Sequence, residues 1–334
     1  MARSVGGRAR SRESNEGDLR MRAIVVTDPA AGRAGMRLVD RPDPDAARLA
    51  GLDGANYGDV VVEVHASGFT GNELEWPSTW VDRLGRDRTP SIPGHEVAGV
   101  VTSLSYGAAG LSVGQRVFGL TDWTRDGTLA EYVVVEARNL APLPGDVDFV
   151  TGAGVAMTGL TAWQGLFEHG HLATGQSVLV HGAAGAVGSM AVQLARECGA
   201  HVVGTGCATH RQAAFDFGAH EFVDLENDTL EEIGKVDLVF DVFGGEVGHR
   251  SAGLVRAGGT LVSIAGSPQV RPTEGRTVDF VVVSERAQLN EIARRVRQGR
   301  LRPNIGRTVS FGDAVAAFRS TEPTSGKTVV RIRG

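Results

Sequence analysis

A Gly-rich turn carries the clearest chemical signal in the sequence. Residues 178–189 read Val-Leu-Val-His-Gly-Ala-Ala-Gly-Ala-Val-Gly-Ser, so an apolar run enters the turn and a helix-like segment leaves it. Such a turn lets the backbone approach a pyrophosphate, and the first free N–H groups of the helix then face the anion. Ala183 stands where the motif usually has its first Gly, and the alternative is a tight turn in an unrelated α/β domain. The turn predicts a dinucleotide site with contacts at Ala184, Gly185, Ala186 and Val187.

The next apolar segment bears on the choice of cofactor. Residues 202–211 read Val-Val-Gly-Thr-Gly-Cys-Ala-Thr-His-Arg, and Gly206 stands where an NAD site usually has an Asp or Glu for the ribose hydroxyls. No carboxylate is left there to repel a 2′-phosphate, and Arg suits phosphate geometry. We therefore expect NADPH rather than NADH, with donors at Thr205, Thr209, His210 and Arg211. The alternative for Arg211 is a solvated residue at the start of a helix.

Alternating short strands and helices position these two segments. The sequence predicts strands at 177–181, 201–205, 221–223, 238–242, 260–265 and 278–283, and helices at 152–169, 187–198, 212–217 and 286–298. This alternation is typical of a doubly wound parallel sheet.

The rest of the chain has a different pattern of predicted secondary structure. Up to about residue 145, short strands lie between Gly and Pro, which indicates a strand-rich, barrel-like domain. The tail, with predicted strands at 308–311 and 328–332, is again strand-rich, and we expect it to rejoin the first domain. Residues 1–20 are rich in Arg, Ser, Gly and Glu and are expected to form a disordered leader.

Length and composition exclude several classes of protein. The chain has 334 residues, a net charge of −5 and 42% hydrophobic residues, which suits about two globular domains. The mild acidity disfavours a nucleic-acid partner, and no apolar run approaches the ~20 residues that cross a bilayer. The 2 cysteines are too few for a disulfide framework or a four-thiolate zinc site. We expect a cytoplasmic protein.

From residue 21 onward, ordered motifs resemble the medium-chain dehydrogenase/reductase superfamily. They are ASG (66–68), PGHEVAGVV (93–101), VGQRV (113–117), AEY (130–132), LTAW (160–163), AAGAVGS (183–189), FDVFGG (240–245) and GKTVV (326–330). The chain looks most like the zinc-independent quinone oxidoreductase and enoyl reductase branch. The resemblance implies an α/β fold: a GroES-like, barrel-shaped catalytic domain (21–145 and 300–334) plus a Rossmann doubly wound parallel sheet that binds NADP (146–299).

The same resemblance assigns the nicotinamide side of the site, which lies in the cleft between the two domains. The contacts that it implies are Thr161, Phe243, Ile264, Ala265 and Val282. The alternative for Thr161 is a helix residue that bonds back to its own backbone.

The resemblance also bears on metal. Zinc members of the superfamily hold catalytic metal at positions that here are Thr70, His95 and Met157, with Glu96 beside the His. Because a catalytic zinc needs about three protein ligands and no thiolate remains, we expect no metal. His95 and Glu96 are then expected to be framework residues.

Without a Lewis acid, a conjugated acceptor is easier to reduce than an alcohol or simple ketone, because its own conjugation takes up the charge. The segment after the first motif offers Asn72, Glu73 and Trp76, and Trp123 lies in another loop that we expect at the cleft. These tryptophans suggest a flat, conjugated substrate, although core packing explains each of them equally well. Glu73 is a candidate acid, and it is equally well explained as a salt-bridged structural carboxylate. Because the segment has no Tyr, protonation is assigned to Thr70, Asn72, the cofactor ribose or water.

The favoured function is therefore an oxidoreductase that transfers hydride from NADPH to a quinone or α,β-unsaturated carbonyl without zinc. The alternatives are a zinc-type alcohol dehydrogenase and a catalytically silent NADPH-binding sensor or scaffold. The apolar run 278–283, at the expected edge of the sheet, predicts a homodimer joined edge to edge.

Overall fold

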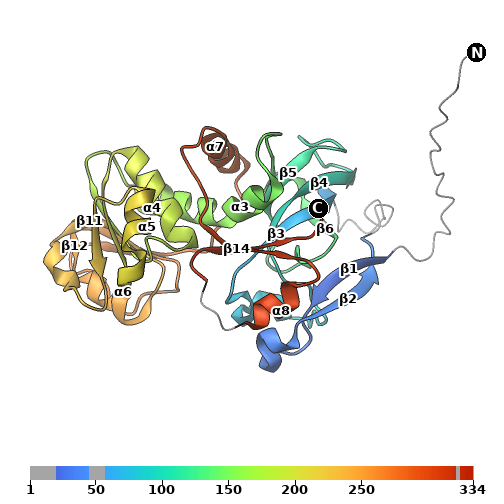
Figure 1. Ribbon diagram of the computed structural model, residues 1–334, viewed down its shortest axis with the longest axis horizontal. Helices are drawn as coiled ribbons and strands as arrows, with labels where there is room; N and C mark the ends of the chain where they lie inside the picture. Colours follow the sequence, from blue (N-terminus) through green and yellow to red (C-terminus); the bar gives the residue numbers. More distant parts are fainter. Residues whose placement is uncertain (1–19, 45–56, 321–323, 334) are drawn as a thin grey trace, which may run out of the picture.

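The computed structural model describes residues 20–44, 57–320 and 324–333. Within these ranges the chain forms two lobes, each built around its own sheet, with α3 between them (Figure 1). The leader predicted at residues 1–20 lies outside the described residues, except for Arg20. Among the described residues, no helix combines the length and the apolar character needed to span a membrane.

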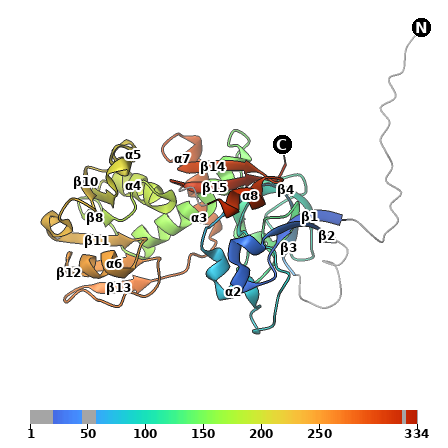
Figure 2. The same cartoon turned by 60° about the horizontal axis from the view of Figure 1, so that its bottom comes forward.

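A seven-stranded sheet forms the first lobe, in the order β14-β15-β3-β4-β5-β7, with β6 paired to β3. Its strands are β3 (Asp59–Phe69), β4 (Glu96–Leu104), β5 (Arg116–Leu120), β6 (Tyr132–Glu136), β7 (Leu140–Pro142), β14 (Ile305–Ser310) and β15 (Lys327–Arg331). The tail rejoins this lobe as the sequence predicts, because β15 lies antiparallel to β3 (Figure 2). A separate hairpin consists of β1 (Arg20–Val25) and β2 (Arg37–Pro42).

Parallel strands form the second lobe, a six-stranded sheet in the order β10-β9-β8-β11-β12-β13. They are β8 (Ser177–Val180), β9 (His201–Gly206), β10 (Glu221–Asp224), β11 (Val236–Asp241), β12 (Val255–Ser263) and β13 (Arg276–Asp279). Both faces are buried, since Val178 and Leu179, which alternate along β8, belong to different core clusters. The strand order reverses between β8 and β11, and sheets of this type bind ligands at the carboxyl ends of such strands.

The remaining elements connect and cover these sheets. The α-helices are α2 (Pro77–Trp80), α3 (Phe149–Trp163), α4 (Ala186–Cys198), α5 (Arg211–Phe217), α6 (Gly245–Ala252), α7 (Arg286–Arg297) and α8 (Ala314–Arg319). The 3₁₀ turns are η1 (Pro29–Gly35), η2 (Glu73–Glu75), η3 (Ala137–Asn139), η5 (Ala208–His210) and η6 (Leu230–Ile233), and η4 (Gln164–His169) is a π-helical turn.

The predicted helix 152–169 proves to be two elements, α3 followed by the π-helical turn η4. The turn places Gln164, whose amide exchanges two hydrogen bonds with the Val283 backbone, at 2.8 and 3.1 Å. A π turn inside a helix often marks a functional position. Here it fixes a distant segment beside α3.

These hydrogen bonds between Gln164 and Val283 explain why the strand predicted over 278–283 is wrong in its end point. The edge strand β13 ends at Asp279, and residues 280–283 leave the sheet. The chain turns away because Gln164 holds Val283, and Phe280 and Val282 consequently line the cleft described below.

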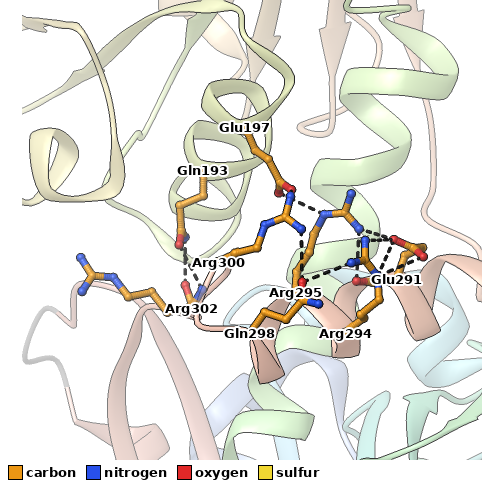
Figure 3. A network of polar contacts seen from close by, with 8 residues as sticks. All are labelled: Gln193, Glu197, Glu291, Arg294, Arg295, Gln298, Arg300 and Arg302. Carbon is orange, nitrogen blue, oxygen red and sulfur yellow. Dashed lines mark hydrogen bonds and ion pairs between the residues drawn. The ribbon is translucent and has the colours of Figure 1, made fainter.

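A polar network ties α7 and the return segment to α4 (Figure 3). Arg295 of α7 donates to Glu197 of α4 at 3.0 Å, and Arg300 also pairs with Glu197. The amide of Gln193 exchanges hydrogen bonds with both backbone groups of Arg302, at 2.9 and 3.0 Å. The network fixes the path by which the chain returns to the first lobe.

Candidate active site

A cleft of about 1210 Å³ is lined by residues from both lobes. Of the predicted site residues, it brings together Thr70, Asn72, Trp76, Trp123, Thr161, Ala186, Val187, Phe243, Ile264, Ala265 and Val282. The predicted residues outside its lining are Glu73, Ala184, Gly185, Thr205, Thr209, His210 and Arg211.

The Gly-rich turn lies at one end of this cleft, where Ala186 and Val187 begin α4. Gly182 has a φ of +61°, which favours glycine, and its carbonyl accepts from Gly185 N at 2.7 Å. A Cβ at Gly188 would collide with that carbonyl, so only glycine allows the helix to start so close to the strand. The first-turn amides of a 13-residue helix therefore open at the cleft, as a pyrophosphate requires.

A buried histidine supports the turn from behind. His181 bonds Thr205 Oγ1 through Nδ1 at 2.8 Å and Ser251 Oγ through Nε2 at 2.6 Å. Because the Ser251 hydroxyl donates to Val247 O, the network assigns the proton of the neutral ring to Nε2. Burial lowers the pKa of His181 to about 4, against a smaller opposing effect of Asp241. The ring therefore acts as a neutral link between β8, β9 and α6.

The same contact corrects the role predicted for Thr205. Its side chain is 0% exposed and its hydroxyl is engaged by His181, so it supports the turn and does not reach a 2′-phosphate. Thr209 and His210 lie on η5 beside the strand end, where each contacts Cys207 Sγ, at 3.1 and 3.2 Å. Arg211 donates to Asp228 at 3.1 Å. The guanidinium thus already has an acidic partner.

The predicted substrate role of Glu73 is also wrong. The side chain is 0% exposed and accepts from Gly94 N at 2.5 Å and from Thr70 N at 3.4 Å. Burial raises the pKa of Glu73 to about 8, although these backbone donors and Lys327 oppose the rise. Since η2 turns this side chain inward, Glu73 holds the loop of Thr70 and does not contact a ligand in the cleft.

Two tryptophans form an aromatic wall of the cleft over His95. The ring centroids of Trp76 and Trp123 are 5.5 Å apart, and Trp123 lies 5.0 Å from His95. His95 is 1% exposed and bonds Thr121 Oγ1 through Nδ1 at 2.9 Å. Burial lowers its pKa to about 3, with a smaller effect of Arg88. The neutral ring therefore packs as part of the framework, as the sequence suggested.

Comparison with known proteins agrees with this arrangement. A family model for the alcohol dehydrogenase GroES-like domain matches residues 56–145, and one for a zinc-binding dehydrogenase matches residues 217–330. The 2-methylene-furan-3-one reductase of Solanum lycopersicum is 32% identical over 272 residues, which are 76% of this chain and 68% of the reductase. The chain belongs to the medium-chain dehydrogenase/reductase superfamily.

Further relatives place this medium-chain dehydrogenase/reductase in the quinone oxidoreductase branch. The quinone oxidoreductase of Pongo abelii is 31% identical over 225 residues, 64% of this chain and 67% of that protein. The spectinabilin polyketide synthase system protein NorB of Streptomyces orinoci is 34% identical over 310 residues, which are 87% of this chain but 14% of NorB. The quinone oxidoreductase structure from Coxiella burnetii shares the fold, with a TM-score of 0.80, 24% identity, and coverage of 94% of this chain and 100% of the other.

The positions that the resemblance gives to zinc ligands carry no thiolate in this family member. Thr70 Oγ1 donates to Met157 Sδ at 3.5 Å, so two of the positions that the resemblance gave to ligands contact each other as hydroxyl and thioether. In the parts of the chain that the structure describes, no group of three or more His, Cys, Asp or Glu could hold a metal ion. The Gly-rich turn, in contrast, fits the pyridine nucleotide that the superfamily uses.

Sequence reasoning missed cationic residues that line the cleft, namely Arg33, Arg307 and Lys327. Lys327 belongs to the GKTVV motif, but its spacing from Thr70 gives no sign of contact. In the structure its ammonium donates to Thr70 Oγ1 at 3.0 Å and pairs with buried Glu96. Arg33 donates to Gly71 O at 2.7 Å.

Proposed function

We propose that the protein is an NADPH-dependent reductase of a quinone or an α,β-unsaturated carbonyl, and that it works without a metal. The observation that supports this function is a single cleft that joins the Gly-rich turn to Thr70, Met157 and the aromatic wall of Trp76 and Trp123. No Asp, Glu, His or Cys is among the described residues of that lining. When bound, the reduced nicotinamide supplies a hydride, and the conjugated substrate accepts the resulting charge.

The preference for NADPH is part of the proposal. Gly206 at the end of β9 carries no carboxylate to bind ribose hydroxyls or to repel a phosphate. Thr209 is exposed and His210 half-buried next to it, so both side chains have access to a phosphate. Arg211 must exchange Asp228 for the phosphate.

The relatives support the class of acceptor. One is called a 2-methylene-furan-3-one reductase and another a quinone oxidoreductase, and both names describe conjugated acceptors. Two tryptophans that meet edge to face at 5.5 Å offer apolar surface to such a flat molecule.

We also propose the organisation of the molecule. The catalytic domain comprises 21–145 and 300–334, and the nucleotide-binding domain 146–299. A homodimer forms through residues 278–283, where Val281 and Val283 are 74% and 61% exposed. Cys198 and Cys207 are free thiols, as a reducing compartment keeps them, and we propose the cytoplasm as the location.

One set of measurements tests the function. The purified protein is titrated with NADPH and NADH by fluorescence, and then assayed with NADPH against 1,4-benzoquinone and cyclohex-2-enone, with metal content determined in parallel. We expect tighter binding of NADPH, turnover of at least one acceptor, and activity that resists a chelator. Stoichiometric zinc with chelator-sensitive activity would support an alcohol dehydrogenase. Tight NADPH binding with no turnover would support a silent sensor or scaffold.

A further inference from the structure

A buried ion pair lies behind the wall of the cleft. Glu96 begins β4 and Lys327 begins β15, and both strands pair with β3 at the end that leads into Thr70. The side chains of Glu96 and Lys327 form an ion pair and are only 1% and 5% exposed. Gly68 of β3 makes room, because a Cβ there would collide with the Glu96 carboxylate. A buried ion pair is costly to desolvate and by itself is weak support for stability, so it invites a functional explanation.

The hydroxyl of Thr70 connects this pair to the cleft. Lys327 Nζ donates to Thr70 Oγ1 at 3.0 Å, and Thr70 directs its own proton at Met157 Sδ at 3.5 Å. A thioether is a weak acceptor, so the hydroxyl proton is available to a better one. On the other side of the loop, the Glu73 carboxyl holds Thr70 N. Thr70 and Lys327 both line the cleft.

The lining offers few groups that can release a proton. Its described members include no Asp, Glu, His, Cys or Tyr. Its other cations are Arg33 and Arg307, and a guanidinium does not give up its proton in proteins. Among the described residues of the lining, the Lys327 ammonium is therefore the group suited to acid catalysis.

We propose that Lys327, acting through Thr70, supplies the proton that completes reduction of an α,β-unsaturated carbonyl, an inference that rests on the proposed function. Hydride addition forms a C–H bond at the β-carbon, and the π electrons move onto the carbonyl oxygen as an enolate. The enolate α-carbon takes the Thr70 hydroxyl proton while Thr70 Oγ1 takes one from Lys327. Lys327 is left as a neutral amine, and water restores its proton.

Glu96 positions Lys327 and drives its recovery. Burial raises the pKa of Glu96, while the Lys327 ammonium and Met157 N, which donates at 3.3 Å, oppose that rise. Once Lys327 is neutral, the carboxylate has lost its counter-charge in a buried position. Reprotonation of the amine is therefore favoured. Glu73, the other buried carboxyl near the ammonium, has a pKa raised to about 8 and is mostly protonated at neutral pH.

Replacement of Lys327 by Arg separates charge from proton release. Lys327→Arg keeps a cation beside Glu96 but cannot release a proton, whereas Lys327→Met removes both the charge and the proton. Thr70→Val removes the hydroxyl at position 70, and Thr70→Ser keeps it. Lys235→Arg, a matched substitution at a lysine that bonds Gly253 O in the second lobe, is the control. Each variant is assayed with NADPH and cyclohex-2-enone or 1,4-benzoquinone, in H₂O and D₂O, with melting temperature recorded.

We expect Lys327→Arg, Lys327→Met and Thr70→Val to lose about 100-fold in kcat with the enone, with KM changed less than about threefold. The solvent isotope effect should rise as water becomes the donor, and Thr70→Ser should stay near wild type. Quinone turnover should fall much less, because the hydroquinone anion leaves with its charge on oxygen and is protonated by water. Lys235→Arg should match wild type.

Two results would overturn the relay while leaving the proposed function intact. One is enone turnover by Lys327→Arg within about threefold of wild type with an unchanged isotope effect. The other is an equal loss with both acceptors accompanied by a lower melting temperature, which indicates a structural role. A wild type that binds NADPH but reduces neither acceptor overturns the proposed function, and the relay with it.

Discussion

At the scale of single residues, the proposed binding of the NADPH 2′-phosphate depends on competition for the guanidinium of Arg211. The ion pair of Arg211 and Asp228 is 3.1 Å long, and its side chains are 43% and 46% exposed. Solvent weakens pairs that are exposed to this extent, whereas a phosphate dianion binds Arg more strongly. NADPH is therefore expected to displace Asp228 from Arg211.

Substitutions of the two partners should act in opposite directions. Asp228→Asn should tighten NADPH binding by about 2- to 10-fold, because Arg211 then has no anionic competitor, and Arg211→Ala should weaken it by about 10-fold. NADH, which lacks the phosphate, should bind both variants as it binds the wild type. Fluorescence titration with the two cofactors measures the difference, and equal changes for both would contradict the assignment.

At the scale of elements, His181 makes the second lobe sensitive to acid. Its folded-state pKa of about 4 lies below the unfolded value of 6.5, so the unfolded chain binds more protons between these values. The contribution of His181 to the stability of the folded state is therefore complete above pH 6.5 and is lost as the pH falls toward 4. His95, with a pKa lowered to about 3, contributes in the same direction.

Thermal unfolding between pH 7 and pH 5 tests this account. The melting temperature of the wild type should fall over that range, and His181→Gln should be less stable at pH 7 but show a shallower fall. His201→Gln, at a histidine whose side chain is 47% exposed, is the matched control and should follow the wild type. An unchanged slope in His181→Gln would refute the role of His181.

The contact between α4 and α7 is a second prediction at this scale. Arg295, with a side chain 15% exposed, donates to Glu197 and lies with its guanidinium carbon 5.0 Å from the centroid of the Trp163 ring. Arg295→Ala should lower the free energy of unfolding by about 2 kcal/mol through the lost ion pair and ring contact. Arg294→Ala, at a neighbouring arginine whose side chain is 45% exposed, should lower the free energy of unfolding much less, because solvent weakens its ion pair with Glu291. Urea unfolding compares them, and equal losses would show that the network does not fix α7.

At the scale of the whole molecule, α3 and its π-helical end join the lobes and shape the cleft. Glycines of α3 let both sides approach it, since a Cβ at Gly152 would lie 3.0 Å from Leu143 and one at Gly159 3.0 Å from Ile292. Gln164 then holds Val283 on the nucleotide side. The segment after β13 therefore has two roles, because Phe280, Val281 and Val282 line the cleft while Val281 and Val283 are also largely exposed.

The proposed dimer depends on that exposed edge. We expect light scattering to give twice the 35.1 kDa mass of one chain, and Val281→Glu combined with Val283→Glu to give a single-chain mass, because charge in an apolar interface is costly. Val113→Glu, at a valine 62% exposed in the first lobe, should leave the dimer intact. A wild type of single-chain mass would refute the dimer.

Much of the fold was predictable because its signals are local. The alternation of short apolar strands and helices over 177–298, and the glycines of the turn at 182–188, follow from residues that are near one another in the chain. The structure confirms the parallel sheet and the return of the tail to the first lobe. Even the absence of thiolates at Thr70 and Met157 could be seen from residue identity.

Pairings across the fold were decided by tertiary structure alone. The contact of Arg211 with Asp228 depends on how β9 and β10 lie side by side. The contacts of Glu73 with Gly94 N and of Lys327 with Glu96 depend on segments that are distant in the chain. The spacing of residues along a strand sets the side of the sheet on which they lie, but not which other strand lies beside it. The sequence therefore determined the fold class and the class of cofactor, a pyridine nucleotide, whereas the burial of the Glu96–Lys327 pair came from strand pairing around β3.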